Sequence, residues 1–416
     1  MPCDWYRDGA IPAGWATPTP FKRILHRVVT TALSRKGSPH YTARSPLSIE
    51  NSYETHVYQS GYVDEGYSAL DIPTSAALEY VRDHAAATRR ATASSRSSRV
   101  AAESARVLIV VDAGCDMPTA WLHNHSIAVV PVDIHFGTQT VRDVRDDTSC
   151  GEFAHSLLNA PMPMLRAEAL TPVQIRDHLQ SWMGPNVDFV LQMTFAASRS
   201  KVHMSSLSAM QSLVLIHNKV RRSMPGRGSL NAWVIDTQNG LTGMAVLLAY
   251  AVQLRDRGVA AAQISPALKI IRDKLHTLLV PGDLRYLSQA AQLKEDAGLP
   301  AWKASLGRAL DITLLMYAGG GDIHPLKRIR GQQRACETAL ARAMRHVELG
   351  LATQAVCVSF AGDVEALIVM PAFGLLNAEC KRRNVELITS NMSMTGCLKL
   401  GPGALSVSFA SERFLS

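Results

Sequence analysis

The sequence predicts an α/β protein of two domains behind an irregular N-terminal extension. In the stretch Val107–Pro118, five apolar residues, mostly β-branched, run into Asp112 and a glycine turn. From there to the C-terminus, short apolar runs alternate with helical patterns, as in right-handed βαβ units. Residues 1–105 lack this alternation. We therefore expect an extension at 1–105, a first domain at 106–280 with a mostly parallel sheet and flanking helices, and a second α/β domain at 281–416.

The extension contains one segment that resembles an ordered element, Phe21–Gly37. Its apolar residues fall on one helical face, and lysines and arginines surround that face. Such a helix either binds a membrane surface or a partner, or docks on its own protein. Ala87–Arg99 is small, polar and basic, as linkers are. We expect the extension to be partly disordered or loosely helical.

The stretch Val107–Pro118 predicts a buried strand, a tight turn and a helix. Asp116 is expected to cap that helix, and Pro118 to lie in its first turn. Ligands of α/β sheets bind beyond the carboxyl ends of the strands, so this turn is a candidate ligand edge. Cys115 is either a thiol activated by the helix N-terminus or a small residue that fills the turn.

The remaining elements of the first domain follow in order. Ile127–Gly137 is a strand that continues into an edge segment, and Thr171 with Pro172 begins a capped helix. The other expected strands are Val187–Thr194 and Asn231–Asp236. The other expected helices are Thr148–Leu158, 200–222, Leu241–Arg257 and Ile264–Leu278.

The second domain opens with Ala309–Gly331, which predicts two strands joined by a turn at Gly319–Asp322. A phosphate-binding loop should open a helix, and Ile323 onward has a strand pattern instead, so this turn is expected to be a hairpin. A helix, a strand, a helix and a strand then follow, and a Gly-Pro-Gly turn leads into a last strand. Their expected ranges are Gln332–Leu349, Ala355–Phe360, Asp363–Arg382, Val385–Ser390 and Gly401–Ala410.

Composition limits the class of protein. The formal charge is +8, but basic and acidic residues are mixed over most of the chain, and no groove-reading or base-stacking motif occurs, so we expect no nucleic acid partner. The seven cysteines are scattered, without zinc spacing or CxxC pairs, which favours free thiols in a reducing cytoplasm. No apolar run reaches the roughly 18 residues of a membrane span. We therefore expect a cytoplasmic protein.

Motifs of known chemistry are missing. The sequence contains no GxSxG, Walker A, GxGxxG or HExxH motif, and its histidines do not cluster at metal spacing. Asp112 and Asp236 each end a strand, where an aspartate either contacts a ligand or caps a turn. The residues alone therefore predict a binding protein of α/β class without catalytic residues, metal or cofactor.

Several stretches occur in the order found in the DegV family of bacterial fatty-acid-binding proteins, which the chain resembles from about Val107 to its C-terminus. They are VVDAGCDMP (Val110–Pro118), IAVVPVDIHFG (Ile127–Gly137), AASRSKVHMSS (Ala196–Ser206), VIDTQNGLTGM (Val234–Met244), DLRYL (Asp283–Leu287), GRALDI (Gly307–Ile312), DIHPLKRIRG (Asp322–Gly331) and GPGAL (Gly401–Leu405).

The resemblance implies a two-domain DegV-like fold that encloses one long-chain fatty acid, its only bound ligand, in an apolar tunnel. The carboxylate would emerge near the domain boundary. Some members of the family act as the acyl-carrying subunit of fatty acid kinase, so a separate kinase subunit is the implied protein partner. The chain itself would be a carrier and not an enzyme.

The chain departs from the family where the carboxylate is held. A Thr-Ser pair is replaced near Ala167–Glu168, and the glutamate would repel a carboxylate. Ser200 is retained, but Lys201 and Val202 replace a glycine and a threonine, and Lys399 stands where the family has histidine. Arg330 and Gly401 are retained. The fatty-acid-binding residues implied are Ser200, Lys201, Lys399, Gly401 and Arg330.

Two explanations of these departures remain open. Lys201 and Lys399 take over anion binding as point charges, or the head-group site is lost. In the second case, the chain is a ligand-free interaction protein on the same fold. A further alternative is an α/β enzyme acting on a small phosphorylated substrate, motivated by the basic residues and the strand-end aspartates.

Overall fold

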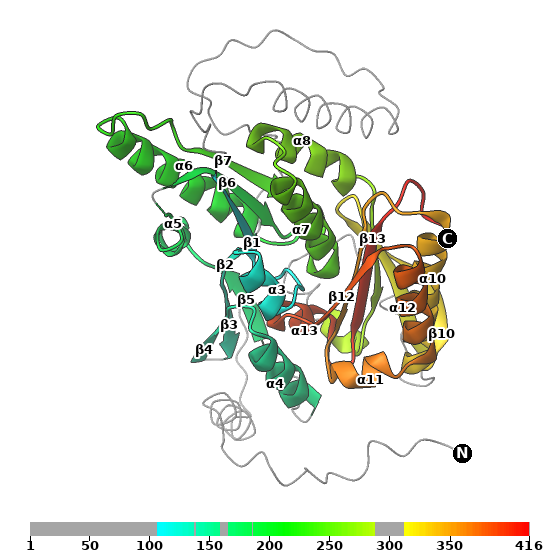
Figure 1. The fold of residues 1–416 in the computed structure, drawn as a ribbon. Coiled ribbons are helices and arrows are strands. Elements are labelled where there is room, and N and C mark those ends of the chain that lie inside the picture. Colours follow the sequence, from blue (N-terminus) through cyan, green and yellow to red (C-terminus); the bar gives the residue numbers. More distant parts are fainter. Residues whose placement is uncertain (1–105, 137–138, 159–164, 185, 288–311, 416) are drawn as a thin grey trace, which may run out of the picture.

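The computed structural model describes residues 106–136, 139–158, 165–184, 186–287 and 312–415, arranged as three sheets with flanking helices (Figure 1). The predicted extension, with its basic helix and its linker, lies outside the described residues. Within them, the predicted α/β class is confirmed.

The first sheet is parallel throughout, as predicted, with the strand order β2-β1-β6-β7. β1 is Val-rich and buried on both faces, which explains its continuous apolar sequence. The sheet's strands are β1 (Arg106–Asp112), β2 (Ala128–Val130), β6 (Val187–Thr194) and β7 (Asn231–Asp236). Its helices are α3 (Thr119–Asn124), α5 (Pro172–Gln180), α6 (Val202–Arg221), α7 (Leu241–Asp256) and α8 (Ala261–Arg272). Thr171 caps α5 in a capping box with Gln174, as expected from Thr171-Pro172.

A small antiparallel sheet follows β2 along the chain. Its order is β4-β3-β5, with β3 (Val132–Phe136), β4 (Gln139–Asp143) and β5 (Leu165–Ala169). The predicted edge segment after β2 is therefore the central strand of a separate sheet, because β4 and β5 pair on both of its sides. Helix α4 (Asp147–Leu158) connects β4 to β5.

The second large sheet has six strands in the order β10-β9-β8-β13-β11-β12. Only the β11–β12 pair is parallel. The Gly319–Asp322 turn joins β9 to β10 as the predicted hairpin. The strands are β8 (Leu275–Val280), β9 (Ile312–Gly319), β10 (Asp322–Arg330), β11 (Ala355–Phe360), β12 (Glu386–Asn391) and β13 (Leu405–Ala410), and the helices are α10 (Gln332–Leu349), α11 (Val364–Ile368), α12 (Pro371–Arg382) and α13 (Met394–Leu400).

Three expectations about these elements were wrong. The helix expected at Ile264–Leu278 ends at Arg272, and Leu275–Val280 is strand β8. The single helix expected at Asp363–Arg382 is broken before Pro371, which begins α12. Helix α13 was not predicted. The expected domain boundary after residue 280 stays a prediction, and β8, just before it, is hydrogen-bonded in the six-stranded sheet.

Helix α7 lies between the parallel sheet and the six-stranded sheet (Figure 1). Nearly all of its residues are buried, which is why its sequence is apolar all round. One apolar core runs from the parallel sheet through α7 to the six-stranded sheet; we call it the inter-sheet core. Six buried methionines belong to it: Met117, Met193, Met244, Met316, Met392 and Met394.

Candidate functional site

The carboxyl end of β1 is organised by Asp112. Its Oδ1 accepts a hydrogen bond from the Gly114 backbone N–H at 2.9 Å, and its Oδ2 accepts one from the Phe195 N–H at 2.6 Å. Burial raises the pKa of Asp112 to about 6, against the opposing effect of these backbone donors. Asp112 therefore fixes the turn after β1 against the loop after β6.

Asp236, at the end of β7, fixes the loop after β6 from the other side. Its Oδ1 accepts hydrogen bonds from the N–H groups of Ala197, at 3.1 Å, and Gln238, at 2.9 Å. Both strand-end aspartates thus cap turns, the structural one of the two roles considered for them. Cys115 is fully buried and burial raises the pKa of its thiol well above the usual value, so it fills the turn. Asp112 and Asp236 therefore no longer support an enzyme that acts on a small phosphorylated substrate.

Lys399 contacts the loop between β6 and α6, whose backbone is bound by Asp112 and Asp236. It lies in the last turn of α13, and its Nζ is 5.0 Å from the centroid of the Phe195 ring, a cation–π distance. Its charge also lowers the pKa of Asp112. The ammonium group therefore stands at the boundary of the inter-sheet core, to which Phe195 belongs.

Ser200 and Lys201 lie in the same loop, immediately before α6. The Ser200 Oγ accepts the Val202 N–H at 3.3 Å, and the Ser200 N–H donates to the Ala196 carbonyl at 3.1 Å. Lys201 is the N-cap of α6 and its side chain is exposed. The structure thus brings Ser200 and Lys201 into the loop that Lys399 contacts through Phe195.

Gly401 begins a tight turn after α13. Its φ of +81° is a conformation that favours glycine, and a Cβ there would lie 2.9 Å from the Tyr286 ring. The N–H groups of Gly282 and Asp283 donate to the Leu400 carbonyl just before this turn, at 2.9 and 3.2 Å. Beside it, a hollow of about 230 Å³ is lined by Leu157, Leu158, Gly282, Asp283, Arg285, Tyr286 and Pro402.

Arg330 ends β10, the edge strand of the six-stranded sheet, and is exposed. The link from this region to the Gly401 turn is made by Gln332, at the start of α10. The Nε2 of Gln332 donates to the Gly403 carbonyl at 2.9 Å. Among the five predicted residues, Lys399 lies over the Phe195 ring, and the loop that begins at Phe195 leads to Ser200 and Lys201. Gly401 and Arg330 belong to the turn after α13 and to the end of β10.

The expected repulsion of a carboxylate by Glu168 stays a prediction, and the structure shows where this side chain lies. It is exposed on β5, and its Oε2 accepts a hydrogen bond from the Arg166 guanidinium at 2.6 Å. The His135 Nε2 lies 3.1 Å from the same oxygen. Its charge is therefore partnered at the outer surface.

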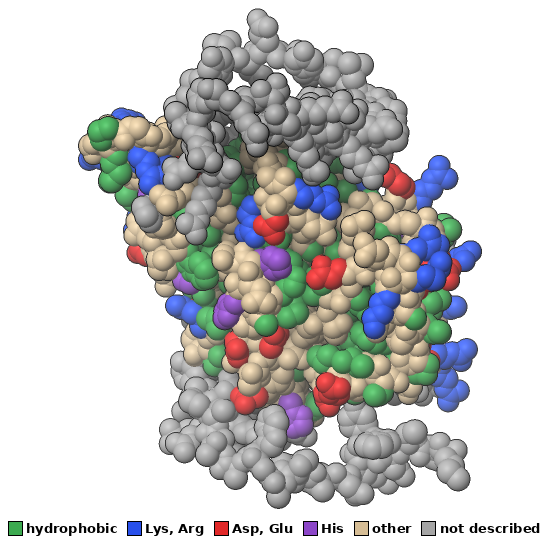
Figure 2. All heavy atoms as spheres, in the orientation of Figure 1, with side chains coloured by type: hydrophobic (Ala, Val, Ile, Leu, Met, Phe, Trp, Pro, Cys, Tyr) green, Lys and Arg blue, Asp and Glu red, His purple; other side chains and the backbone are tan. Residues whose placement is uncertain are grey.

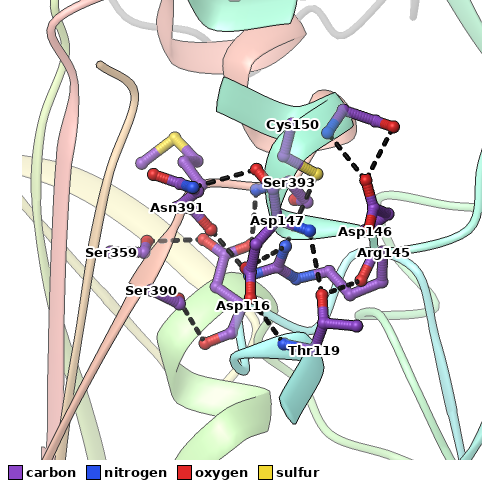
Figure 3. Close-up of polar contacts among 12 residues, drawn as sticks. Asp116, Thr119, Arg145, Asp146, Asp147, Cys150, Ser359, Ser390, Asn391 and Ser393 are labelled. Atoms are coloured by element: carbon purple, nitrogen blue, oxygen red, sulfur yellow. Dashed lines mark hydrogen bonds and ion pairs between the residues drawn. The ribbon is translucent and has the colours of Figure 1, made fainter. Parts of the chain in front are cut away.

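The sequence missed the largest polar cluster of this region, which Figure 3 shows and which we call the charged seam. Asp116 does not cap α3, whose N-cap is Pro118 and has no side-chain bond. Instead, its Oδ2 accepts a hydrogen bond from the Ser359 hydroxyl at 2.5 Å, and its Oδ1 accepts one from the Ser393 N–H at 3.0 Å. The Asp116 carbonyl accepts a further bond from Ser390 at 3.0 Å. The turn after β1 is thereby bound to β11, β12 and α13.

Arg145 is the buried cation of the charged seam. Its guanidinium donates to the Cys115 carbonyl at 3.0 Å, the Asn391 carbonyl at 2.7 Å and the Asp147 carboxylate at 3.2 Å. Burial raises the pKa of Asp116, and it raises that of Asp143, whose Oδ1 accepts the Arg145 N–H, to about 6. Arg145 and Asp143 lie near the end of β4, a strand that the sequence did not predict, so no signal placed them here.

The described residues contain no group of three or more histidine, cysteine or acidic side chains arranged to hold a metal ion. In the same part of the chain, no helix is long and apolar enough to cross a membrane.

Comparisons with known proteins identify relatives of this chain. A DegV domain-containing protein of Xanthomonas axonopodis pv. citri is 31% identical over 311 residues, 74% of this chain and 98% of the relative. A stearic acid-binding protein from Eubacterium ventriosum superposes with a TM-score of 0.58 at 18% identity, covering 73% of this chain and 98% of that one. The Streptococcus pneumoniae fatty acid kinase B3 protein, solved with linoleic acid, gives a TM-score of 0.55 at 15% identity, covering 73% and 99%.

At these identities the two solved structures establish the fold alone. The family assignment rests on sequence: a family model described as "Uncharacterised protein, DegV family" matches residues 106–412. That match begins at the first residue of β1 and covers every described strand and helix. The chain therefore belongs to the DegV family.

Proposed function

We propose that this protein is a carrier that binds a long-chain fatty acid between its two large sheets. The observation that carries the proposal is the inter-sheet core, a continuous apolar interior with a cation, Lys399, at its boundary. Its methionines suit this role, because unbranched, flexible side chains repack around an irregular apolar guest. The core beneath α10 and α12, by contrast, contains no fully buried methionine.

The energetics favour such a ligand. Each buried CH2 group stabilises the complex by about 0.8 kcal/mol, so the acyl chain supplies most of the affinity. The carboxylate must not be buried without a partner. Lys399 offers it a positive charge, and the first turn of α6, with Ser200 and Lys201 before it, offers backbone N–H groups. Arg330 and Gly401 have at most an indirect part in this arrangement.

The same proposal describes a carrier without catalytic groups of its own. A carrier of this kind would present the carboxylate to a separate kinase subunit, as the similarity to the fatty acid kinase B3 protein suggests. A cytoplasmic location fits this proposal, since all six cysteines in the described part of the chain are free thiols.

Native mass spectrometry of the freshly purified full chain tests the proposal. We expect a co-purified long-chain fatty acid, released on unfolding and identified by its mass. A protein that purifies empty and takes up no added fatty acid would overturn the proposal and favour an interaction protein without a ligand.

Single substitutions then test the head-group assignment. Lys399→Ala should weaken fatty-acid affinity about tenfold, the usual effect of removing one charged partner from a partly buried carboxylate. Lys201→Ala should have a smaller effect, because this side chain is exposed. Lys327→Ala, an exposed lysine on β10, is the matched control. Equal affinity of Lys399→Ala and the control would contradict the role of Lys399.

A further inference from the structure

Helix α6 ends in an exposed group of apolar and basic side chains, which we call the α6 tip: Leu215, Ile216, Lys219, Val220, Arg222 and Met224. The exposed fractions of Leu215, Val220 and Met224 are 72%, 51% and 49%. Single exposed apolar residues are ordinary, but several at one helix end mark a binding surface. In Figure 2, apolar and basic side chains meet where α6 projects from the molecule.

The segment that contains the α6 tip carries basic residues and no acidic ones. Residues 195–235 contain six lysines and arginines and no aspartate or glutamate. Asp188, at the start of β6, is bound by Arg221 at 3.0 Å and lies 3.9 Å from Arg227. The exposed cations Lys219 and Arg222 therefore have no acidic neighbour within their own segment.

We propose that the α6 tip docks on an anionic lipid bilayer. Apolar side chains flanked by lysine and arginine are the pattern of surfaces that lie in the headgroup region of such membranes. The tip projects, so that it can penetrate between headgroups, whereas a protein partner would need a matching concave surface (Figure 1). A second copy of this chain would bring two basic tips together and repel. Docking of this kind is independent of the acyl site, because it uses the outer surface alone.

Vesicle co-sedimentation of the full chain tests this. We expect binding to vesicles of equal parts phosphatidylglycerol and phosphatidylcholine to be about tenfold stronger than to phosphatidylcholine alone, and to weaken with salt. The double substitution Lys219→Glu/Arg222→Glu should lower binding to anionic vesicles at least tenfold, and Leu215→Ser/Val220→Ser should lower it several-fold. The matched control, Lys327→Glu/Arg328→Glu on β10, removes the same charge elsewhere and should leave binding unchanged.

A fluorescent label locates the contact. An environment-sensitive probe on Cys3→Ser/Leu215→Cys should brighten and shift to the blue when anionic vesicles are added. The same probe on Cys3→Ser/Leu349→Cys, another exposed leucine site, at the end of α10, should not respond. The described native cysteines are buried and leave the label on the new site.

Three results would overturn the proposal: no preference for anionic vesicles, full binding by both α6 variants, or retention of the chain on a nucleic acid duplex and not on vesicles. Fatty-acid content measured in parallel by native mass spectrometry separates this outcome from failure of the proposed carrier function. An α6 variant that loses vesicle binding but keeps its fatty acid supports docking as a separate property of the tip.

Discussion

Two buried polar clusters join elements that precede β8 in the chain to the six-stranded sheet, and they differ in charge. The charged seam binds the turn after β1 and the end of β4 to β11, β12 and α13 through Asp116 and Arg145. The second cluster is neutral. In it the Thr242 hydroxyl of α7 lies 2.6 Å from the hydroxyls of both Ser406 and Ser408, and Ser408 lies 2.7 Å from Thr277.

The difference has an energetic consequence. The charged seam keeps the carboxylates of Asp116 and Asp143 away from water, and one buried guanidinium offsets their charge, so its balance depends on a single residue. The neutral cluster exchanges hydroxyl–water bonds for hydroxyl–hydroxyl bonds, and each contributes a modest, independent amount. Removal of one group should therefore disrupt the charged seam strongly and the neutral cluster only in part, and only the charged seam should respond to pH.

The largest effect is expected for Arg145→Met. This change leaves buried carboxylates without their cation, and the free energy of unfolding should fall by about 3–5 kcal/mol, measured by urea denaturation. Arg142→Met is the matched control, because Arg142 forms an exposed ion pair with Asp133 and should cost no more than about 1 kcal/mol. Equal losses of unfolding free energy in the two variants would show that burial of the cation does not determine its contribution to stability.

The substitution Thr242→Val should weaken the neutral cluster. The substitution keeps the shape of the side chain and leaves the hydroxyls of Ser406 and Ser408 without this partner, at a cost of about 1–3 kcal/mol. The loss should be the same at pH 5 and pH 8. Thr242→Ser, which keeps the hydroxyl, should recover most of the stability. A loss that changed with pH would contradict the neutral character of the cluster.

Of the two clusters, only the charged seam should contribute to the pH response, beside Asp112, whose pKa is also raised to about 6. Burial raises the pKa of Asp143 to about 6 from 3.8, so between these values the folded state binds the proton that the unfolded state has lost. The stability contributed by this group is therefore present below about pH 4 and lost as pH rises to 6. Relative to the wild type, Asp143→Asn should gain about 2–3 kcal/mol of stability between pH 4 and pH 7, measured by urea denaturation at each pH. A difference that stays constant over this range would show that Asp143 does not titrate there.

The contrast also shows what the sequence could predict. Period and turn residues located β1, α7, the β9–β10 hairpin and most of the other elements, because each pattern is local. β8 was missed because its sequence, LHTLLV, directly follows a helical pattern and shows no strand alternation of its own. Its partners β9 and β13 are also distant in sequence. The Asp116–Ser359 bond spans 243 residues, so the local preference of aspartate for helix caps was the only signal available, and it misled.

The candidate site was also only partly predictable from the sequence. The family pattern pointed to Ser200, Lys201 and Lys399, because each belongs to an ordered motif, and their role in binding stays a prediction. The structure shows Lys399 over the Phe195 ring, in the loop that leads to Ser200 and Lys201. The family pattern could not indicate that Glu168 is partnered by Arg166 at the outer surface, because that depends on the pleat of β5. Departures from a family motif therefore identify positions to examine, while their effect depends on partners from other strands.

The smallest effect is expected between two serines of the charged seam. Ser359 and Ser390 lie opposite each other on the neighbouring strands β11 and β12, and both donate to Asp116. The Ser359 hydroxyl bonds to the carboxylate, whereas the Ser390 hydroxyl bonds to the neutral backbone carbonyl. Ser359→Ala should cost about 1.5–3 kcal/mol and Ser390→Ala about 0.5–1.5 kcal/mol in urea denaturation, a difference of about 1 kcal/mol that measures the contribution of charge.

The pair of serines also controls for packing, because both side chains are buried and both substitutions remove a single oxygen. The Ser359 bond lowers the pKa of Asp116, so its loss should shift the titration of that carboxyl upward, and Ser390→Ala should not. If the two variants lose equal stability at every pH, Asp116 is neutral in the folded protein. Arg145 would then be paired mainly with Asp147 and Asp143, and the effect of Arg145→Met should fall toward that of a partly exposed ion pair.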